Sequence, residues 1–395
     1  MSELWSPSEL ELRDLPQDGV LQARLEAALA DHLTQASGEG VRFRLANPDD
    51  ELSLRALYDA HPMHLSDFDL IYDRSPDFFS LMRARGVAHT LVVAERDGRL
   101  VGTGATSLRR GTWAGREDVL LAYLGDLRVA FDRRLMLRWR KFYAGCLLRF
   151  QRDVGVEAML TAVLGDNLMA QQSLASERKR TPYRYAPCGN LTMLNVLGRW
   201  RRSSPRGQVC WGQAALLDAQ ELRRADLLDH RVWAPGGVPI SVRDASGRPI
   251  LALRIVSPDS RKRMRLSRTG RGFQMARSLS RTLGSPLPGE GECLRTLYAF
   301  QVAFAADLPG PMRAQALFDV AHAVMDQGEL RAREILALPL PSAFGVVQAA
   351  RAGLVAQATS VKLFEVEAIM DLGSSLREAV RESPSRDVAF EMAWV

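Results

Sequence analysis

Apolar and polar residues follow two different periods along the chain, and together they predict a mixed α/β protein. Residues 7–36 carry apolar positions at helical spacing, as in "DGVLQARLEAALADHL", and the glycines of "QASGEG" follow where a helix would stop. The stretch "VRFRL" then alternates as a strand does, the chain turns at Asn47-Pro48, and a helical pattern follows.

The first half continues with a predicted β-hairpin. In "HTLVVAERDGRLVGTGATSLRR" two apolar runs flank Asp97 and Gly98, a pair that strongly favours a tight hairpin turn. A third long strand is expected in "VLLAYLGDLRVA". A basic helix over about residues 133–153, a strand over 156–164 and a helix that starts near Leu168 complete the order.

The second half repeats this order of elements. Turn formers are frequent over residues 199–290, with a second hairpin around Ser246 and Gly247. Next come a long strand (292–304), the helix "MRAQALFDVAHAVMDQG", the strand "REILALPLP", the helix "AFGVVQAARAGLVAQAT" and the strand "VKLFEVEAI". We therefore predict an N-terminal helical extension (1–40), a first domain (41–198), a connecting segment (199–230) and a second, diverged domain (231–395).

Composition adds limits to this picture. Of the 395 residues 47% are hydrophobic and 25% charged, as is usual for globular proteins. There is no apolar run of about 18 residues, and the N-terminus "MSELWSPSELELRD" is unlike a signal peptide, so we expect a cytoplasmic protein without a membrane span. The four cysteines form no CxxC pair and the six histidines complete no zinc pattern, so no metal site is predicted.

Three segments of the first half, taken in order, resemble the GNAT superfamily of acyl-CoA-dependent N-acyltransferases. They are the hairpin "LVVAERDGRLVGTGAT", the strand "YLGDLRVA" with its basic helix start, and "VLGDNLMAQQSL", which is similar to the family's strand followed by Asn-x-x-Ala. The resemblance covers about residues 41–195, and the second half looks like a diverged copy. It implies an α/β protein of two GNAT-like domains, each a mixed, mostly antiparallel sheet flanked by helices.

The resemblance also implies a donor and a site. Acetyl-CoA or another acyl-CoA would be the donor, and the amine of a small molecule or peptide would be the acceptor. The backbone at Leu127, Arg128 and Val129 would line the thioester, where N–H groups can stabilise charge on its oxygen. Asn167 would orient the cofactor arm, and the pyrophosphate would bind at the following helix N-terminus, where the cationic side chains are Arg133, Arg134 and Arg138.

The chain departs from the family pattern at this helix N-terminus. The family usually has Arg-x-x-Gly-x-Gly or Gly-Ala there, because small residues let the backbone approach a phosphate. Here Leu135, Leu137 and Trp139 fall on or beside the glycine positions. Either arginine side chains replace the backbone amides as phosphate ligands, or the pocket is filled and the site is inactive.

Proton transfer would need an acid and a base. The family's tyrosine, seven residues after Asn167, is here Leu174, and Tyr183 or the nearby Tyr185 could take its place; we assign Tyr183, with loop packing as the alternative. Asp126 is the predicted general base, because a carboxylate partly buried beside a cleft can have a raised pKa.

Two further regions have candidate roles, the expected acceptor pocket and a basic segment. His61 and His64 lie where the superfamily commonly builds its acceptor pocket, or they are surface histidines without a role. Residues 254–281 hold eight arginines, one lysine and one aspartate but a single aromatic, Phe273, so nucleic-acid binding is disfavoured and a solvated, mobile loop is favoured.

The function expected from the sequence is acyl-CoA-dependent N-acyl transfer to an amine. The alternative is a catalytically inactive GNAT-like scaffold that binds a ligand, a partner protein or nucleic acid. The second copy has only one arginine in "AFAADLPGPMRAQAL" at its own strand-to-helix corner, so we predict that it is structural.

Overall fold

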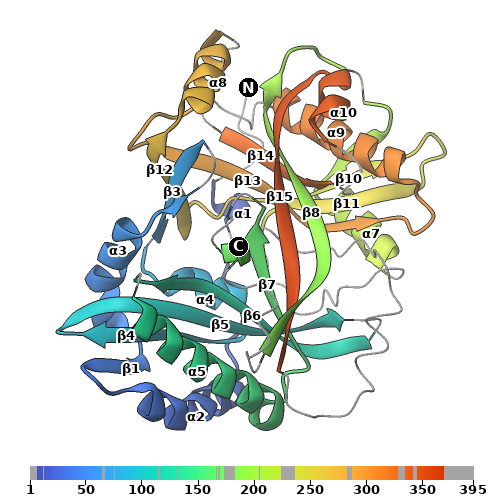
Figure 1. The fold of residues 1–395 in the computed structure, drawn as a ribbon. Coiled ribbons are helices and arrows are strands. Elements are labelled where there is room, and N and C mark those ends of the chain that lie inside the picture. The colour runs from blue at the N-terminus through green and yellow to red at the C-terminus, as the bar shows by residue number, and fades with distance from the viewer. Residues whose placement is uncertain are drawn as a thin grey trace.

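One continuous sheet runs through both halves of the molecule (Figure 1). The computed structural model describes residues 7–368 apart from 12, 65–66, 75, 114–115, 131, 166, 168–169, 173–182, 204, 224–235, 283–286, 328–333 and 341–344. The first half is taken here as residues 7–199 and the second as 205–368. The helix predicted to start near Leu168 lies mostly outside the described residues.

The elements of the first half follow the predicted order with two differences: the helix predicted over 7–36 is interrupted at 13–18, and two strands that were not predicted, 63–64 and 68–74, precede the hairpin. Asp97 and Gly98 both have positive φ, 50° and 71°, as a two-residue hairpin turn requires, so the hairpin is confirmed. The described elements are α1 (Pro7–Leu10), α2 (Gly19–Ala36), β1 (Val41–Leu45), η1 (Pro48–Asp50), α3 (Glu51–Ala60), β2 (Met63–His64), β3 (Phe68–Arg74), α4 (Ser80–Arg85), β4 (Ala88–Arg96), β5 (Arg99–Trp113), β6 (Arg116–Val129), α5 (Arg133–Arg149), the π-helical η2 (Phe150–Val154), β7 (Ala158–Leu164) and β8 (Tyr183–Arg199).

The second half also contains the predicted hairpin, long strand and helices. Its described elements are β9 (Gln208–Trp211), α7 (Gln213–Arg223), β10 (Val238–Arg243), β11 (Pro249–Val256), β12 (Lys262–Thr269), α8 (Arg271–Thr282), β13 (Cys293–Phe304), α9 (Gly310–Asp326), β14 (Glu334–Leu340), α10 (Val346–Arg351) and β15 (Leu354–Ala368).

Both halves carry the same irregularity on one long strand. β6 pairs in parallel with β7 only as far as Tyr123, and β13 pairs in parallel with β14 only as far as Tyr298. Three residues further on, Asp126 and Gln301 each have a φ of 53°, and the register with the antiparallel neighbour shifts by one residue there. A shift of this kind is a β-bulge, which bends a strand and increases its twist. The repeated bulge and parting confirm that the two halves share one architecture.

The last strand of each half completes the sheet of the other half. β15 pairs with β7, and β8 pairs with β14. β8 and β15 are also paired with one another, antiparallel, from Arg199 and Leu354 to Tyr183 and Ala368, and they cross the centre of the molecule together (Figure 1). The strand order is therefore β1-β4-β5-β6-β7-β15-β8-β14-β13-β11-β10-β9.

Each half has its own main apolar core. In the first half α2 and α5 lie side by side beneath the sheet (Figure 1), and their buried side chains meet those of β1, β4 and β6. Leu25, Leu135 and Leu147 are fully buried there. In the second half α7, α9 and α10 cover the sheet. Among the described residues, no helix has the length and apolar character needed to cross a membrane.

Two sequence predictions about the second half are wrong. Residues 262–282 form β12 and α8 rather than a solvated loop. β12 pairs with β3 of the first half, and Arg268 meets the carboxylate of Asp69 there. The helix predicted over "AFGVVQAARAGLVAQAT" ends at Arg351, since Gly353, with φ 88°, turns the chain into β15.

Candidate active site

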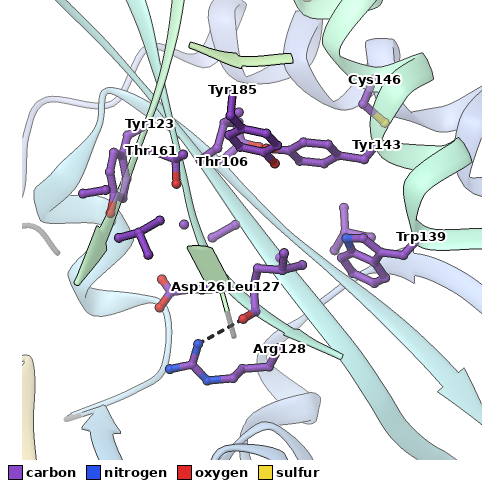
Figure 2. Close-up of a pocket in the computed structure, with 18 of the residues that line it drawn as sticks. Thr106, Tyr123, Asp126, Leu127, Arg128, Trp139, Tyr143, Cys146, Thr161 and Tyr185 are labelled. Carbon is purple, nitrogen blue, oxygen red and sulfur yellow. Dashed lines mark hydrogen bonds between the residues drawn. The ribbon is translucent and has the colours of Figure 1, made fainter. Parts of the chain in front are cut away.

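A cavity of about 150 Å³ lies where β6 and β7 part. Polar side chains from β5, β6 and β7 line one side of it, and side chains of α5 form an apolar side, with Tyr185 of β8 between them (Figure 2). The labelled lining residues are Thr106, Tyr123, Asp126, Leu127, Arg128, Trp139, Tyr143, Cys146, Thr161 and Tyr185.

The bulge on β6 turns backbone groups away from the sheet. The Asp126 carbonyl accepts a hydrogen bond from the Tyr58 hydroxyl (3.2 Å), and the Leu127 carbonyl accepts one from the guanidinium of Arg128 (3.0 Å; Figure 2). The Ala130 N–H donates to the Val101 carbonyl of β5 at 2.8 Å. Because hydrogen-bonding direction alternates along an antiparallel ladder, the N–H of Val129 points to the side from which β7 has parted.

Asp126 is held between two buried arginines. One carboxylate oxygen accepts from Arg74 and the other from Arg85, whose Nη1 is 3.1 Å away. Burial by itself would raise the pKa of Asp126, but the charges of Arg74 and Arg85 outweigh it and hold the pKa well below its usual range. The raised pKa predicted from the sequence is therefore wrong: this carboxylate stays ionised and accepts a proton poorly.

A carboxylate also occupies the N-terminus of α5. Asp132 accepts hydrogen bonds from the backbone N–H groups of Arg134 (2.8 Å) and Leu135 (3.1 Å), and it forms an ion pair with Arg96 at 2.7 Å. The hydrogen bond from Arg96, together with those from the backbone, lowers the pKa of Asp132 to about 2. Two of the amides that would bind a phosphate thus already have a partner. The sequence contained this signal, because Asp is a preferred N-cap residue immediately before a helix.

The three arginines predicted at this corner do not act together. Arg133 and Arg134 are exposed at the start of α5, whereas Arg138 points to the end of α2, where it donates to the Ala36 carbonyl (3.1 Å) and pairs with Glu39 (2.7 Å).

The bulky residues at the family's glycine positions do not fill the corner. Leu135 and Trp139 are buried in the core under the sheet, and Leu137 is half exposed. The indole of Trp139 lies against Gly104 of β5, where an added Cβ would come within 2.9 Å of the ring. The cavity therefore stays open. The space above Gly104 is occupied by the Trp139 ring.

Tyr185 rather than Tyr183 lines the cavity. A side-chain hydrogen bond joins Tyr143 and Tyr185, whose side chains meet beside the cavity (Figure 2). Tyr183 packs edge-on against Tyr143, with ring centroids 5.4 Å apart, outside the lining. Burial raises the pKa of Tyr143 and of Tyr185, so both hydroxyls stay protonated at neutral pH.

The remaining predicted residues divide between the cavity and the surface. Asn167 lines the cavity, and its side-chain oxygen accepts from the Ala170 N–H at 3.0 Å. His64 is exposed and its Nδ1 lies 3.2 Å from the Asp69 carboxylate, and neither it nor His61 is in the lining, although Met63 between them is. Leu174 lies outside the described residues.

No protein-family model matches the sequence, and no curated protein matches it. Solved structures do resemble its fold. N-myristoyltransferase of Saccharomyces cerevisiae with bound myristoyl-CoA is 10% identical with a TM-score of 0.50, over 93% of this chain and 83% of that one. A second structure of that enzyme, with myristoyl-CoA and inhibitors, is 8% identical with a TM-score of 0.51, over 92% and 84%.

A further likeness is to the GCN5-related glucosamine N-acetyltransferase region of a fungal multidomain GH3 β-N-acetylglucosaminidase. Identity is 12% and the TM-score 0.52, over 83% of this chain and 38% of that one. At such identities these likenesses concern the fold alone. Within this chain the parted strands and the bulge occur once in each half. The chain therefore has the fold of the GNAT superfamily, and its two halves repeat one architecture.

Proposed function

We propose that the first half is an acyltransferase that moves an acyl group from a coenzyme A thioester to an amine. The observation that carries the proposal is the parting of β6 from β7 beside the Asp126 bulge, which opens a cavity next to outward-turned backbone. In the reaction the amine nitrogen attacks the thioester carbonyl carbon, a C–N bond forms and the C–S bond breaks. The nitrogen loses a proton and the leaving thiolate gains one.

The residues around the cavity fit the thioester end of such a donor. The Val129 N–H would bind an amide of the pantetheine arm, and Asn167 would orient it. Phe142, Tyr143 and Cys146 on the apolar side would contact the acyl group. These assignments use backbone donors and apolar contacts, the groups that bind an uncharged thioester.

Tyr185 is the proposed acid that protonates the leaving thiolate. Tyr185 lines the cavity, and a hydrogen bond with Tyr143 fixes the position of its hydroxyl. A protonated phenol placed in this way can donate to a developing thiolate. We propose no proton-accepting role for Asp126; its ionised carboxylate positions Arg85 instead.

The pyrophosphate would bind to side chains rather than to helix amides. Asp132 caps α5, so Arg133 and Arg134 are the exposed cations left at that corner. Guanidinium groups bind phosphate oxygens in pairs, although exposed ones are screened by salt. Binding of coenzyme A should therefore be weak and strongly salt-dependent.

Calorimetry with coenzyme A and acetyl-CoA at low and high salt tests the proposal. The double variant Arg133→Ala and Arg134→Ala should weaken binding at least about tenfold. Arg42→Ala, which removes an exposed arginine of β1, is the matched control and should change nothing. Turnover is followed by release of free thiol with a panel of amines. Absence of both binding and turnover would overturn the proposal.

The Asp132 cap also favours a second candidate function. A helix N-terminus already neutralised by its own carboxylate is what a scaffold that no longer binds coenzyme A would retain. Such a scaffold would use the cavity to bind a ligand without chemistry. Ligand binding without any thiol release from acetyl or longer-chain thioesters would favour this candidate.

A further inference from the structure

Buried cations border the cavity on the side opposite α5. Arg74 of β3, Arg85 of α4 and Lys262 of β12 are 1%, 2% and 4% exposed. Asp126, which lines the cavity, bonds to both arginines and accounts for one negative charge. Arg128, half-buried on β6, adds a further positive charge beside it (Figure 2).

The positive charge of this group exceeds the negative charge. Burial and the charges of Arg74 and Arg85 shift the pKa of Lys262 well downwards, which favours its neutral form. Even with Lys262 neutral, Arg74, Arg85 and Asp126 together carry one net positive charge. A buried charge is costly unless it is paired and hydrogen-bonded, so this excess needs an explanation beyond the fold.

Several guanidinium nitrogens of the group have no partner. Nε and Nη1 of Arg74 and Nε of Arg85 find no acceptor within the part of the chain that the structure describes. Polar groups this deeply buried are nearly always hydrogen-bonded in folded proteins. An oxyanion bound in the cavity would bring a negative charge that balances the excess, and it would offer an acceptor to Arg85, the member of this pair that lines the cavity.

The group is open to the cavity through two of its members. Arg85 and Arg128 both belong to the lining. Nη1 of Arg85 lies so close to Gly125 of β6 that an added Cβ there would be 3.5 Å from it. Two lining tyrosines contact the group: the Arg85 guanidinium lies 5.0 Å from the ring centroid of Tyr123, and the Lys262 ammonium lies 4.4 Å from that of Tyr72.

We propose that the acceptor is a small amine that carries an oxyanion group, a carboxylate or a phosphate, and that Arg85 and Arg128 bind this group. Arg74 supports them from behind through Asp126. The inference rests on the proposed acyl transfer and specifies its substrate class. Because a cavity of about 150 Å³ must also receive the thioester end of the donor, the acceptor would be small, such as a small amino acid or an aminoalkyl phosphate.

The experiment compares matched amines with the full-length protein and acetyl-CoA. Alanine and phosphoethanolamine carry the oxyanion, whereas alaninamide and ethylamine lack it. The expected result is a kcat/KM at least about 100-fold higher for one of the first pair, because a site built to bind a polar group discriminates strongly against ligands without it. Which of the two is preferred identifies the oxyanion.

Variants connect this preference to named side chains. Arg85→Met should abolish it, and Arg128→Met, at a half-buried position, tests the same site should the first variant fold poorly. Arg83→Met is the matched control on the same helix, because Arg83 is partly exposed and pairs with Asp77. It should leave the preference unchanged.

Direct binding separates failure of the inference from failure of the proposed function. Thermal shift and calorimetry with alanine and phosphoethanolamine are run first without any thioester and then with acetyl-CoA. Equal acetylation of charged and neutral amines overturns the inference and leaves acyl transfer standing. If either oxyanion binds in a way that depends on Arg85 but no turnover occurs, the inference about the pocket holds and the proposed acyl transfer is rejected. No binding of either compound, with or without acetyl-CoA, overturns the inference.

Discussion

Asp126→Asn is the substitution that most directly tests the electrostatics of the site. In the protein Arg74 and Arg85 are 1% and 2% exposed, and the Asp126 side chain that both contact is 9% exposed. Removing the charge leaves two buried guanidinium groups uncompensated, and breaking a buried pair in this way costs about 3–5 kcal/mol. The amide keeps one acceptor in place, so we expect a loss of about 3 kcal/mol in the free energy of unfolding.

Urea unfolding followed by fluorescence at several pH values measures this loss. Since the pKa of Asp126 is lower in the folded protein than its ordinary value of 3.8, the stabilisation is fully present above pH 3.8 and is lost as the pH falls through the folded value. The difference between wild type and variant should therefore be equal at pH 5 and pH 7 and should shrink below pH 3.8.

Asp118→Asn provides the matched control on the same strand. Asp118 is exposed and pairs with exposed Arg110, so its substitution should cost less than about 0.5 kcal/mol. A cost below about 1 kcal/mol for Asp126→Asn, or a difference that grows between pH 5 and pH 7, would refute the account of Asp126 as a permanently ionised anchor.

Three further substitutions test other parts of the structure. Gly104→Ala should lower the free energy of unfolding by about 1–3 kcal/mol, because the new Cβ meets the Trp139 ring. In a double-mutant cycle, adding Trp139→Phe should recover part of that loss. Strictly additive losses would contradict the contact. Asp132→Ser keeps an N-cap but removes a negative charge at the start of α5. Calorimetry at low salt should therefore show roughly tenfold tighter binding of coenzyme A. Unchanged affinity would exclude a phosphate site at this corner. Because the pKa of Lys262 is lowered in the folded protein, the free energy of unfolding of the wild type should rise with pH up to 10.5, the ordinary lysine value. Lys262→Met should remove up to about 1.4 kcal/mol of that rise per pH unit. Urea unfolding at pH 7 and 9 measures the rise, and an equal rise in wild type and variant would count against this role of Lys262.

The sequence predicted the local order of elements well, because hairpins and amphipathic helices depend on neighbouring residues. The Asp97-Gly98 turn and the strands around it are confirmed. The exchange of β8 and β15 could not be predicted, since each strand finds its partners in the other half of the chain.

The candidate site was less predictable than the fold. The pKa of Asp126 depends on Arg74 and Arg85, which are 52 and 41 positions away in sequence, and no local pattern shows that proximity. The cations of β12 resembled a solvated segment because their carboxylate partners lie in the first half. The Asp132 cap is different: a helix-start rule applied to Asp132 would have predicted it.

The crossing of β8 and β15 has a consequence for how the chain is made. While the protein is being synthesised, β7 has no neighbour on one side until residues 361–365 leave the ribosome, about 200 positions later. An unpaired strand edge exposed for that long is a site for mispairing with other nascent chains. Production of this protein should therefore respond to chaperone supply and to translation rate, and truncation before β15 should yield an insoluble first half.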